Sequence, residues 1–534
     1  MRSLRTLIAL VFLFVPTASL IHAQGQPSGD SSQIPTGTGM GATKEEVDEL
    51  RSEVAAQKKT IEELKALVQR LVDASPQATN VSPVPDGSAP SSGTPHLVNA
   101  TYVEPEIFAV SSQAAVASQT ATPKKETPLA AGWNGEHFFI RSSDGQFQLL
   151  PYGYFQSDYR AYLSGDGTPA NTFLIRRARF GFQGNYGSHY DFALLIDGAT
   201  SGPVLRDLYV NARPVPEFQV QIGQYKEPFA QEELTAVTNI DFIERSLASL
   251  LYPSASTAYR SPGITLHGDI KGGVMQWWAG AFNGKGILVN NTTSEPEFIA
   301  RLRFYPWRKK KDSLFQGLAF GGSFAHGRTR ALSNEQSFSA CLPDAAYCFF
   351  PTFIVNGATE RYNAEGTWVH GRWGVRAEYD QLNQDRDGVG SFQANALGFT
   401  NLPTIRSKAG YAQATYLLTG ETRPENGTPR VKRPFLGPEG AGGAHGYGAF
   451  ELAFRYSRIQ AIEPGLAQPG SLTPGFVPTF DQHTDQFTIG LNWYLNYWVK
   501  YQANVSIDRL SSPSTLGQVP QNFAVLLQRL QFRF

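Results

Sequence analysis

The sequence predicts an all-β fold: a transmembrane antiparallel β-barrel of about sixteen strands, preceded by a short α-helical coiled coil. Segments of about ten residues alternate between apolar and polar side chains, and short turns alternate with long polar loops. The segment Leu526–Phe534 illustrates the first pattern, because Leu530 and Phe532 share one face and Arg529 and Arg533 share the other. Such a strand suits an apolar surrounding on one side and water on the other.

The N-terminus predicts an exported protein. Residues 1–23 combine an early basic stretch, an apolar stretch from Leu7 to Val15 and a small residue, Ala23, at a cleavage site, as a signal peptide does. An N-terminal membrane anchor is the alternative. The apolar stretch is shorter than the ~20 residues of a spanning helix, and no later stretch approaches that length. We therefore expect a periplasmic protein, a secreted protein or an outer-membrane barrel.

Composition favours the barrel. The chain has 35 Phe, 22 Tyr, 8 Trp and 51 Gly but only 3 Met, which is typical of many strands joined by tight turns. The mean hydropathy of −0.27 is slightly polar, as expected where every second strand residue faces a wet lumen. Formal net charge is zero, so we expect no nucleic acid as a partner.

Four further regions follow the signal peptide. Residues 24–42 are rich in Gly, Ser and Pro and predict a flexible linker. Residues 43–74 predict a coiled coil, and residues 75–145 predict a low-complexity linker. The barrel is expected over 146–534. The coiled coil rests on two heptad positions, one filled by Val47, Val54, Ile61 and Val68 and the other by Leu50, Gln57, Leu64 and Leu71.

A helix of this length is marginal alone, so we expect the coiled coil to be oligomeric and to lie in the periplasm. Its heptad residues do not decide between two strands and three, and holding a homotrimer together is the role we favour. Two alternatives stay open for it. One is a single amphipathic helix packed on another surface, and the other is contact with the cell wall.

The strand pattern is clear in the segment from Phe298 to Phe304. Phe298 and Leu302 face one way, whereas Arg301 and Arg303 face the other. The same alternation occurs at 372–380, 450–456, 486–493 and 497–508. A large soluble sandwich or propeller is the alternative, but no internal repeat of propeller length is visible.

The connections also alternate in length. Short turns are expected at 185–188, 213–216, 271–273, 370–371 and around Asn496. Long loops are expected at 227–260, 283–296, 327–356, 385–405, 461–482 and 511–520. Short periplasmic turns opposite long external loops are typical of outer-membrane barrels. Two segments on the short side depart from this rule: the basic turn 307–313 and the Gly/Pro-rich segment 420–446.

Several segments resemble the phosphate-selective porin O/P family. They are Ile175–Phe182, Gln221–Phe229, Phe242–Ser246, Gly448–Ser457, Asn492–Asn496 and Arg529–Phe534. Ending on a terminal Phe also resembles the closing strand of bacterial outer-membrane barrels. The resemblance covers the chain from about residue 146 to the end. It implies a sixteen-stranded, trimeric outer-membrane porin in which the loop after Lys226 folds into the lumen and lumen arginines guide anions.

A pore has no catalytic group, so its chemistry is that of its lining. The candidates for pore-lining or anion-binding residues are Arg177, Arg179, Arg301, Arg303, Arg376, Arg455 and Lys226. A guanidinium binds phosphate or carboxylate bidentately and stays charged. The alternative is that these arginines pair with wall carboxylates and only brace the barrel. Strict alternation directs Arg176 toward lipid, so we expect it either to reach the membrane surface or to lie in a bulge.

The candidate constriction loop is acidic as well as basic. Its charged residues of interest are Glu227, Glu233, Glu244 and Arg245. The resemblance implies lysines at a phosphate site in this region, but only Lys226 is evident here. We therefore expect small anionic or neutral solutes rather than high-affinity phosphate binding.

Other chemistry has little support in the sequence. Cys341 and Cys348 lie close together in an exported chain and predict a possible disulfide, with two free thiols as the alternative. We expect no metal, no cofactor and no enzyme, since Gly-x-Ser-x-Gly and His-Glu-x-x-His motifs are missing. Besides solutes, outer-membrane lipid is the expected partner. A weakly selective general porin, a structural tether and a barrel lipase are the competing functions.

Overall fold

The computed structural model describes most of the chain from residue 129 onward. The described ranges are 129–133, 137–163, 170–199, 202–251, 259–330, 355–388, 401–437, 446–463, 480–510 and 522–534. The predicted signal peptide, the coiled coil and the pair Cys341 and Cys348 lie outside these ranges. Within them, no helix is both long and apolar enough to cross a membrane.

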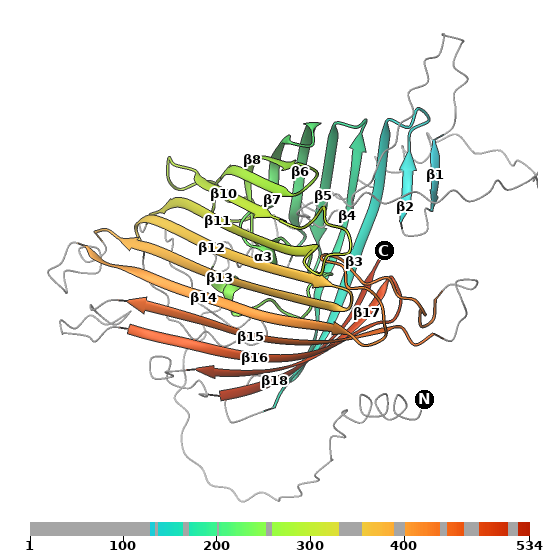
Figure 1. Cartoon of the computed structure of the whole chain (residues 1–534). Coiled ribbons are helices and arrows are strands. Elements are labelled where there is room, and N and C mark those ends of the chain that lie inside the picture. Colours follow the sequence, from blue (N-terminus) through green and yellow to red (C-terminus); the bar gives the residue numbers. More distant parts are fainter. Residues whose placement is uncertain are drawn as a thin grey trace, which may run out of the picture. The chain divides into compact units, whose positions relative to one another are not determined.

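Sixteen antiparallel strands of the described chain form a closed barrel, as predicted (Figure 1). Each strand pairs with its neighbours in sequence, and β3 (Phe147–Tyr162) pairs with β18 (Asn522–Arg533) to close the ring. The others are β4 (Thr172–Tyr186), β5 (Tyr190–Asp197), β6 (Val204–Val215), β7 (Phe218–Lys226), β8 (Arg260–Ile270), β9 (Met275–Phe282), β10 (Glu297–Phe304), β11 (Gly317–Thr329), β12 (Gly357–His370), β13 (Trp373–Arg386), β14 (Leu402–Leu417), β15 (Ala449–Glu463), β16 (Phe480–Tyr494) and β17 (Val499–Leu510). A closed ring leaves no strand edge unpaired inside the bilayer.

The wall separates apolar from polar side chains as the alternation predicts. On β10, Phe298 and Leu302 are 56% and 58% exposed on the outer face, whereas Arg301 and Arg303 are 1% and 2% exposed on the inner face. The same division holds on β13, where the side chain of Trp373 is outside and that of Arg376 is inside. An apolar outside and a charged inside match a barrel that stands in lipid.

The two ends of the barrel differ. Strands β4, β12 and β16 end on the same side as Phe534 and continue into short turns, at residues 187–189, 371–372 and 495–498. The opposite end carries the long connections, so the short-turn end is the periplasmic one. The two exceptions noted in the sequence, 307–313 and 420–446, lie in the connections 305–316 and 418–448, which also leave the periplasmic end.

A short hairpin precedes the barrel inside the region predicted as a linker. Strands β1 (Ala130–Trp133) and β2 (Phe138–Arg141) pair with each other, and β2 pairs with the start of β3. Trp133 packs against Trp498, with ring centroids 5.9 Å apart. Strands of four residues are too short to show a clear period-two pattern, which is why the linker prediction left this hairpin out.

Candidate functional site: the lumen and the segment that crosses it

The described part of the connection between β7 and β8 that follows β7, residues 227–251, lies inside the barrel and is called the crossing segment below. It contains α3 (Gln231–Leu234) and η1 (Leu247–Leu251), and every residue from Glu227 to Ser249 is buried. Its backbone is bonded to inward-facing side chains of the wall. The backbone N–H of Glu232 donates to Glu378 of β13 (2.7 Å), that of Ile243 to Asn504 of β17 (2.7 Å), and Lys500 donates to the Thr238 carbonyl (2.8 Å). Buried backbone groups need such partners, so the wall determines the path of this segment.

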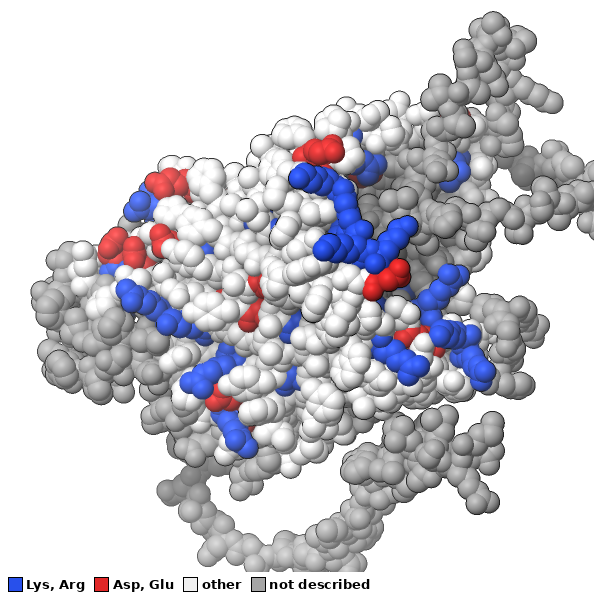
Figure 2. Space-filling view, in the orientation of Figure 1, with Lys and Arg blue, Asp and Glu red and all other residues white. Residues whose placement is uncertain are grey.

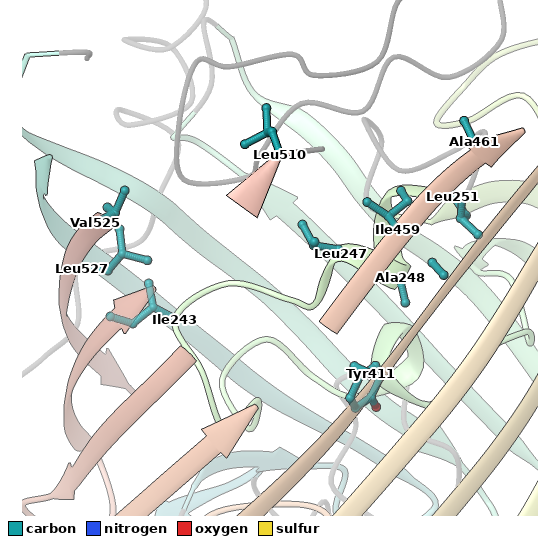
Figure 3. Close-up of a cluster of buried hydrophobic side chains, with 11 residues drawn as sticks. Ile243, Leu247, Ala248, Leu251, Tyr411, Ile459, Ala461, Leu510, Val525 and Leu527 are labelled. Atoms are coloured by element: carbon teal, nitrogen blue, oxygen red, sulfur yellow. The ribbon is translucent and has the colours of Figure 1, made fainter. Parts of the chain in front are cut away.

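Apolar contacts hold the returning half of the segment. Figure 3 shows Ile243, Leu247 and Leu251 beside side chains of β14, β15, β17 and β18. The partners on these strands are Ala409, Tyr411, Ile459, Ala461, Leu510, Val525 and Leu527. Phe229 and Ala230 belong to a second buried cluster near the start of the segment. These clusters fill part of the lumen with apolar side chains and hold the segment at both ends.

The carboxylate of Glu244 lies among four arginines of the wall. Arg176 donates to Glu244 over 2.8 Å, and Arg160 and Arg529 lie 3.3 Å away. Arg177 is the fourth, at 3.8 Å. Burial alone would raise the pKa of Glu244, but the arginines, Arg176 first, hold that pKa well below its ordinary value. Glu244 is therefore charged throughout the neutral and mildly acidic range.

A β-bulge explains why Arg176 faces inward. The register between β3 and β4 passes from Arg177, opposite Gln156, to Ile175, opposite Ser157, and leaves Arg176 without a partner residue. This is the bulge that the sequence offered as one of two explanations for the residue. The side chain of Arg176 remains 32% exposed, more than those of the other three arginines around Glu244.

Three side chains surround the carboxylate of Asp241. Arg423 binds its carboxylate, Gln413 donates to it over 2.7 Å, and Arg376 lies 3.7 Å away. Burial opposes the charge, but Arg423 and Arg376 lower the pKa of Asp241. Arg423 belongs to the periplasmic segment 418–448 and also binds Glu451 of β15. The segment that departed from the short-turn rule therefore reaches the lumen.

The remaining acidic residues of the crossing segment have unequal surroundings. Glu227 pairs with Arg361 of β12 (3.0 Å), and Glu232 lies 3.5 Å from Arg455 of β15. Glu233 forms no ion pair among the described residues, and its Oε1 has no hydrogen-bond partner there. Burial raises the pKa of Glu233 well above its ordinary value.

The predicted basic residues do line the inside of the wall, but they do not gather in one place. Arg301 and Arg303 share Glu365 of β12, at 2.5 and 2.6 Å, and Arg303 also binds Glu425. Six strands away, Arg179 pairs with Asp197 over 2.8 Å. Lys226 donates to the carbonyls of Leu234 and Thr235, and Arg245 donates to those of Glu232, Glu233 and Thr235. Much of this positive charge is thus compensated locally.

Several residues of this network were not singled out from the sequence. Arg160, Asp158 and Arg361 follow the same alternation as the predicted residues, so the strand period would have found them. Arg423 and Glu425 had no such signal, because they lie in an irregular Gly/Pro-rich segment. Glu227, Glu244 and Arg245, which the sequence did single out, all take part in the network.

Comparisons with known proteins agree with this architecture. The sequence profile of the family described as phosphate-selective porin O and P matches residues 151–534. Porin O of Pseudomonas aeruginosa is 21% identical over 68% of this chain and 83% of its own length. A protein of Caulobacter vibrioides, described only as uncharacterized, is 24% identical over 78% of this chain and 79% of its own length.

Two outer-membrane proteins are among the solved structures to which this chain is similar. The channel DcaP of Acinetobacter baumannii is 9% identical, with a TM-score of 0.45 over 74% of this chain and 99% of that chain. OmpT of Vibrio cholerae is 10% identical, with a TM-score of 0.45 over 73% and 98%. The closed barrel and the match over residues 151–534 point to an outer-membrane channel rather than an enzyme. The chain belongs to the phosphate-selective porin O and P family.

Proposed function

We propose that the protein is a passive diffusion channel that prefers small anions, inorganic phosphate among them, and also passes small neutral solutes. The observation that carries the proposal is the arginine cluster around Glu244. Arg160, Arg176, Arg177 and Arg529 face two carboxylates there, those of Glu244 and Asp158, and so leave two positive charges in excess.

The chemistry of this cluster suits a passing anion. Arg176 is the most exposed of the four arginines and donates to Glu244 through Nε (2.8 Å) and Nη2 (3.4 Å). A guanidinium that stays charged at working pH forms charge-assisted hydrogen bonds with a phosphate or carboxylate oxygen. Conduction also requires binding that is weak enough for the solute to leave. The burial of the whole crossing segment supports a narrow passage, in which a local excess of charge acts strongly on the solute.

The same network argues for modest rather than high selectivity. Arg301 and Arg303 are paired with Glu365, Arg361 is paired with Glu227, and Lys226 is bound to backbone carbonyls. An ion pair presents little net charge to a solute. We therefore expect anions to be favoured near Glu244 and only weakly elsewhere.

The test is the reversal potential of the purified protein in planar bilayers under a potassium chloride gradient, with phosphate then added in steps. The wild-type protein is expected to be anion-selective, and phosphate is expected to reduce the chloride current. The double variant Arg160→Gln and Arg176→Gln should lose most of this preference. Arg406→Gln with Lys408→Gln is the matched control, because it removes equal charge from the outer face of β14. A double variant that keeps the wild-type reversal potential would refute the proposal.

A weakly selective general porin is the second candidate. The local pairing of Arg301 and Arg303 with Glu365 and of Arg361 with Glu227 favours it, because these pairs leave little net charge of either sign in much of the lumen. Equal passage of cations and anions in the wild-type protein would support this candidate. If no current flows in any condition, the structural tether that uses the predicted coiled coil becomes the better proposal.

A further inference from the structure

The turn between β10 and β11 is the most concentrated run of positive charge in the described chain. It contains Arg308, Lys309, Lys310 and Lys311 in succession, followed by the single acid Asp312. All three lysines are exposed, and none has an ion-pair partner among the described residues. The run lies in a periplasmic turn outside the lumen, so the function proposed above gives it no role.

The turn has a defined conformation. The backbone N–H of Lys310 donates to the Trp307 carbonyl (2.9 Å), and that of Gln316 donates to the Ser313 carbonyl (3.0 Å). The guanidinium of Arg308 lies over the ring of Tyr305, 5.0 Å from its centroid. These contacts hold the backbone of the turn in one conformation, so the three lysines extend from a fixed position at the end of the barrel wall.

Apolar side chains of the same turn continue the lipid-facing surface. Leu314 and Phe315 are 50% and 47% exposed, and Phe315 packs on Trp307 with ring centroids 5.5 Å apart. The indole N–H of Trp368, on the outer face of β12, donates to the Leu314 carbonyl (2.9 Å). The adjacent residue of β11 on that face is Leu318, opposite Trp368. Tryptophan and exposed apolar residues at a strand end mark the level of the membrane interface.

We propose that this turn binds the phosphate groups of anionic phospholipids in the periplasmic leaflet of the outer membrane. Figure 2 shows basic side chains gathered at the end of the barrel where the turn joins β10 to β11. Leu314, Phe315 and Trp307 lie against the acyl chains, and Lys309, Lys310 and Lys311 reach the headgroups just beyond them. An ammonium binds phosphate as a compact charge, and clustered lysines at a membrane surface attract anionic lipids.

The arrangement favours a lipid over a soluble acidic partner. A protein or a cell-wall peptide would need the lysines alone, whereas here apolar side chains on the outer wall stand beside them. This site is outside the lumen, so it depends on the position of the barrel in the outer membrane and not on anion preference of the pore.

The experiment is native mass spectrometry of the detergent-solubilised protein with phosphatidylglycerol or phosphatidylethanolamine added. The wild-type protein is expected to bind phosphatidylglycerol at least about tenfold more tightly. The triple variant of Lys309→Gln, Lys310→Gln and Lys311→Gln should lose that preference. The control variant of Arg430→Gln, Lys432→Gln and Arg433→Gln removes equal charge from the other periplasmic segment and should keep it.

Three results would overturn the proposal. One is equal binding of the two lipids by the wild-type protein, and another is an unchanged preference in the lysine variant. The third is lysine-dependent binding of glycerol phosphate or of acidic cell-wall peptides as tight as that of the lipid, because the apolar side chains would then contribute nothing. Single-channel conductance of the lysine variant should equal that of the wild type, which confirms folding and keeps this test separate from that of the pore.

Discussion

Glu244 illustrates how one residue organises charges from distant parts of the chain. Its four arginines come from β3, β4 and β18, which are separated in sequence but meet at the seam of the barrel. Four cations without a carboxylate between them would repel one another in a place that water hardly reaches. Glu244 therefore lets the wall concentrate arginines near the crossing segment, and it leaves part of their charge for a solute.

Glu233 should make the stability of the protein depend on pH. Its pKa is raised by burial, so the folded state binds the proton more tightly than the unfolded state, where glutamate titrates near ~4.3. The contribution to stability is complete below that value and is lost as pH rises through the raised pKa. Glu233→Gln should thus gain thermal stability relative to the wild type as pH rises from 4 to 8. The check is the unfolding midpoint in detergent, measured by circular dichroism.

The control for Glu233 is Glu217→Gln, which neutralises an exposed glutamate in the short turn between β6 and β7. Its stability should track that of the wild type across the same pH range. A difference between Glu233→Gln and the wild type that does not change with pH would contradict the prediction.

At the scale of elements, the strands could be predicted and the irregular segments could not. The alternation of Phe298, Arg301 and Leu302 assigns both faces of β10, because one face meets lipid and the other meets the lumen. No such periodic signal exists for residues 418–448. The described residues of this segment are held by long-range partners, such as the contact of Arg423 with Asp241, which no local pattern reveals.

The same distinction between predictable and unpredictable features holds for the functional site. The inward position of Arg177, Arg179, Arg301 and Arg303 follows from the strand period. Their pairing does not, because it depends on which strands are neighbours and on where the crossing segment lies. Arg303 illustrates this, since its partners Glu365 and Glu425 are 62 and 122 residues away. Anion binding by these residues stays a prediction.

Arg423 should restrain the crossing segment from the periplasmic side. It joins Asp241 of that segment to Glu451 of the wall. Arg423→Gln removes one partner from a buried ion-pair network, and breaking a buried pair typically costs about 3–5 kcal/mol. We expect the segment to become mobile, with more current noise and a broader distribution of single-channel conductance.

Arg430→Gln is the matched control for Arg423→Gln, since Arg430 is an exposed arginine of the same periplasmic segment. Its current traces should be as quiet as those of the wild type. Equal noise in the wild type and in Arg423→Gln would mean that the apolar clusters and the remaining hydrogen bonds and ion pairs fix the segment without Arg423.

At the scale of the whole molecule, the described barrel has its chemistry inside and its membrane contacts outside. The inner wall holds compensated charge around a buried segment, and the outer wall is apolar apart from its ends. The pore is therefore complete within a single chain. Assembly of several chains should affect how stably the barrels stay together more than what each one conducts.

This separation leads to a prediction for the N-terminal region. If residues 43–74 form a trimeric coiled coil, deleting them should lower the proportion of trimers in a dilution series, because three barrels would lose a contact that holds them at high local concentration. The conductance of each channel should not change. Light scattering in detergent measures the mass, and deletion of residues 24–42, which lack heptads, is the control. Trimers that resist dilution equally in both deletions would show that the barrel walls alone hold the assembly, and the heptads would then need another partner.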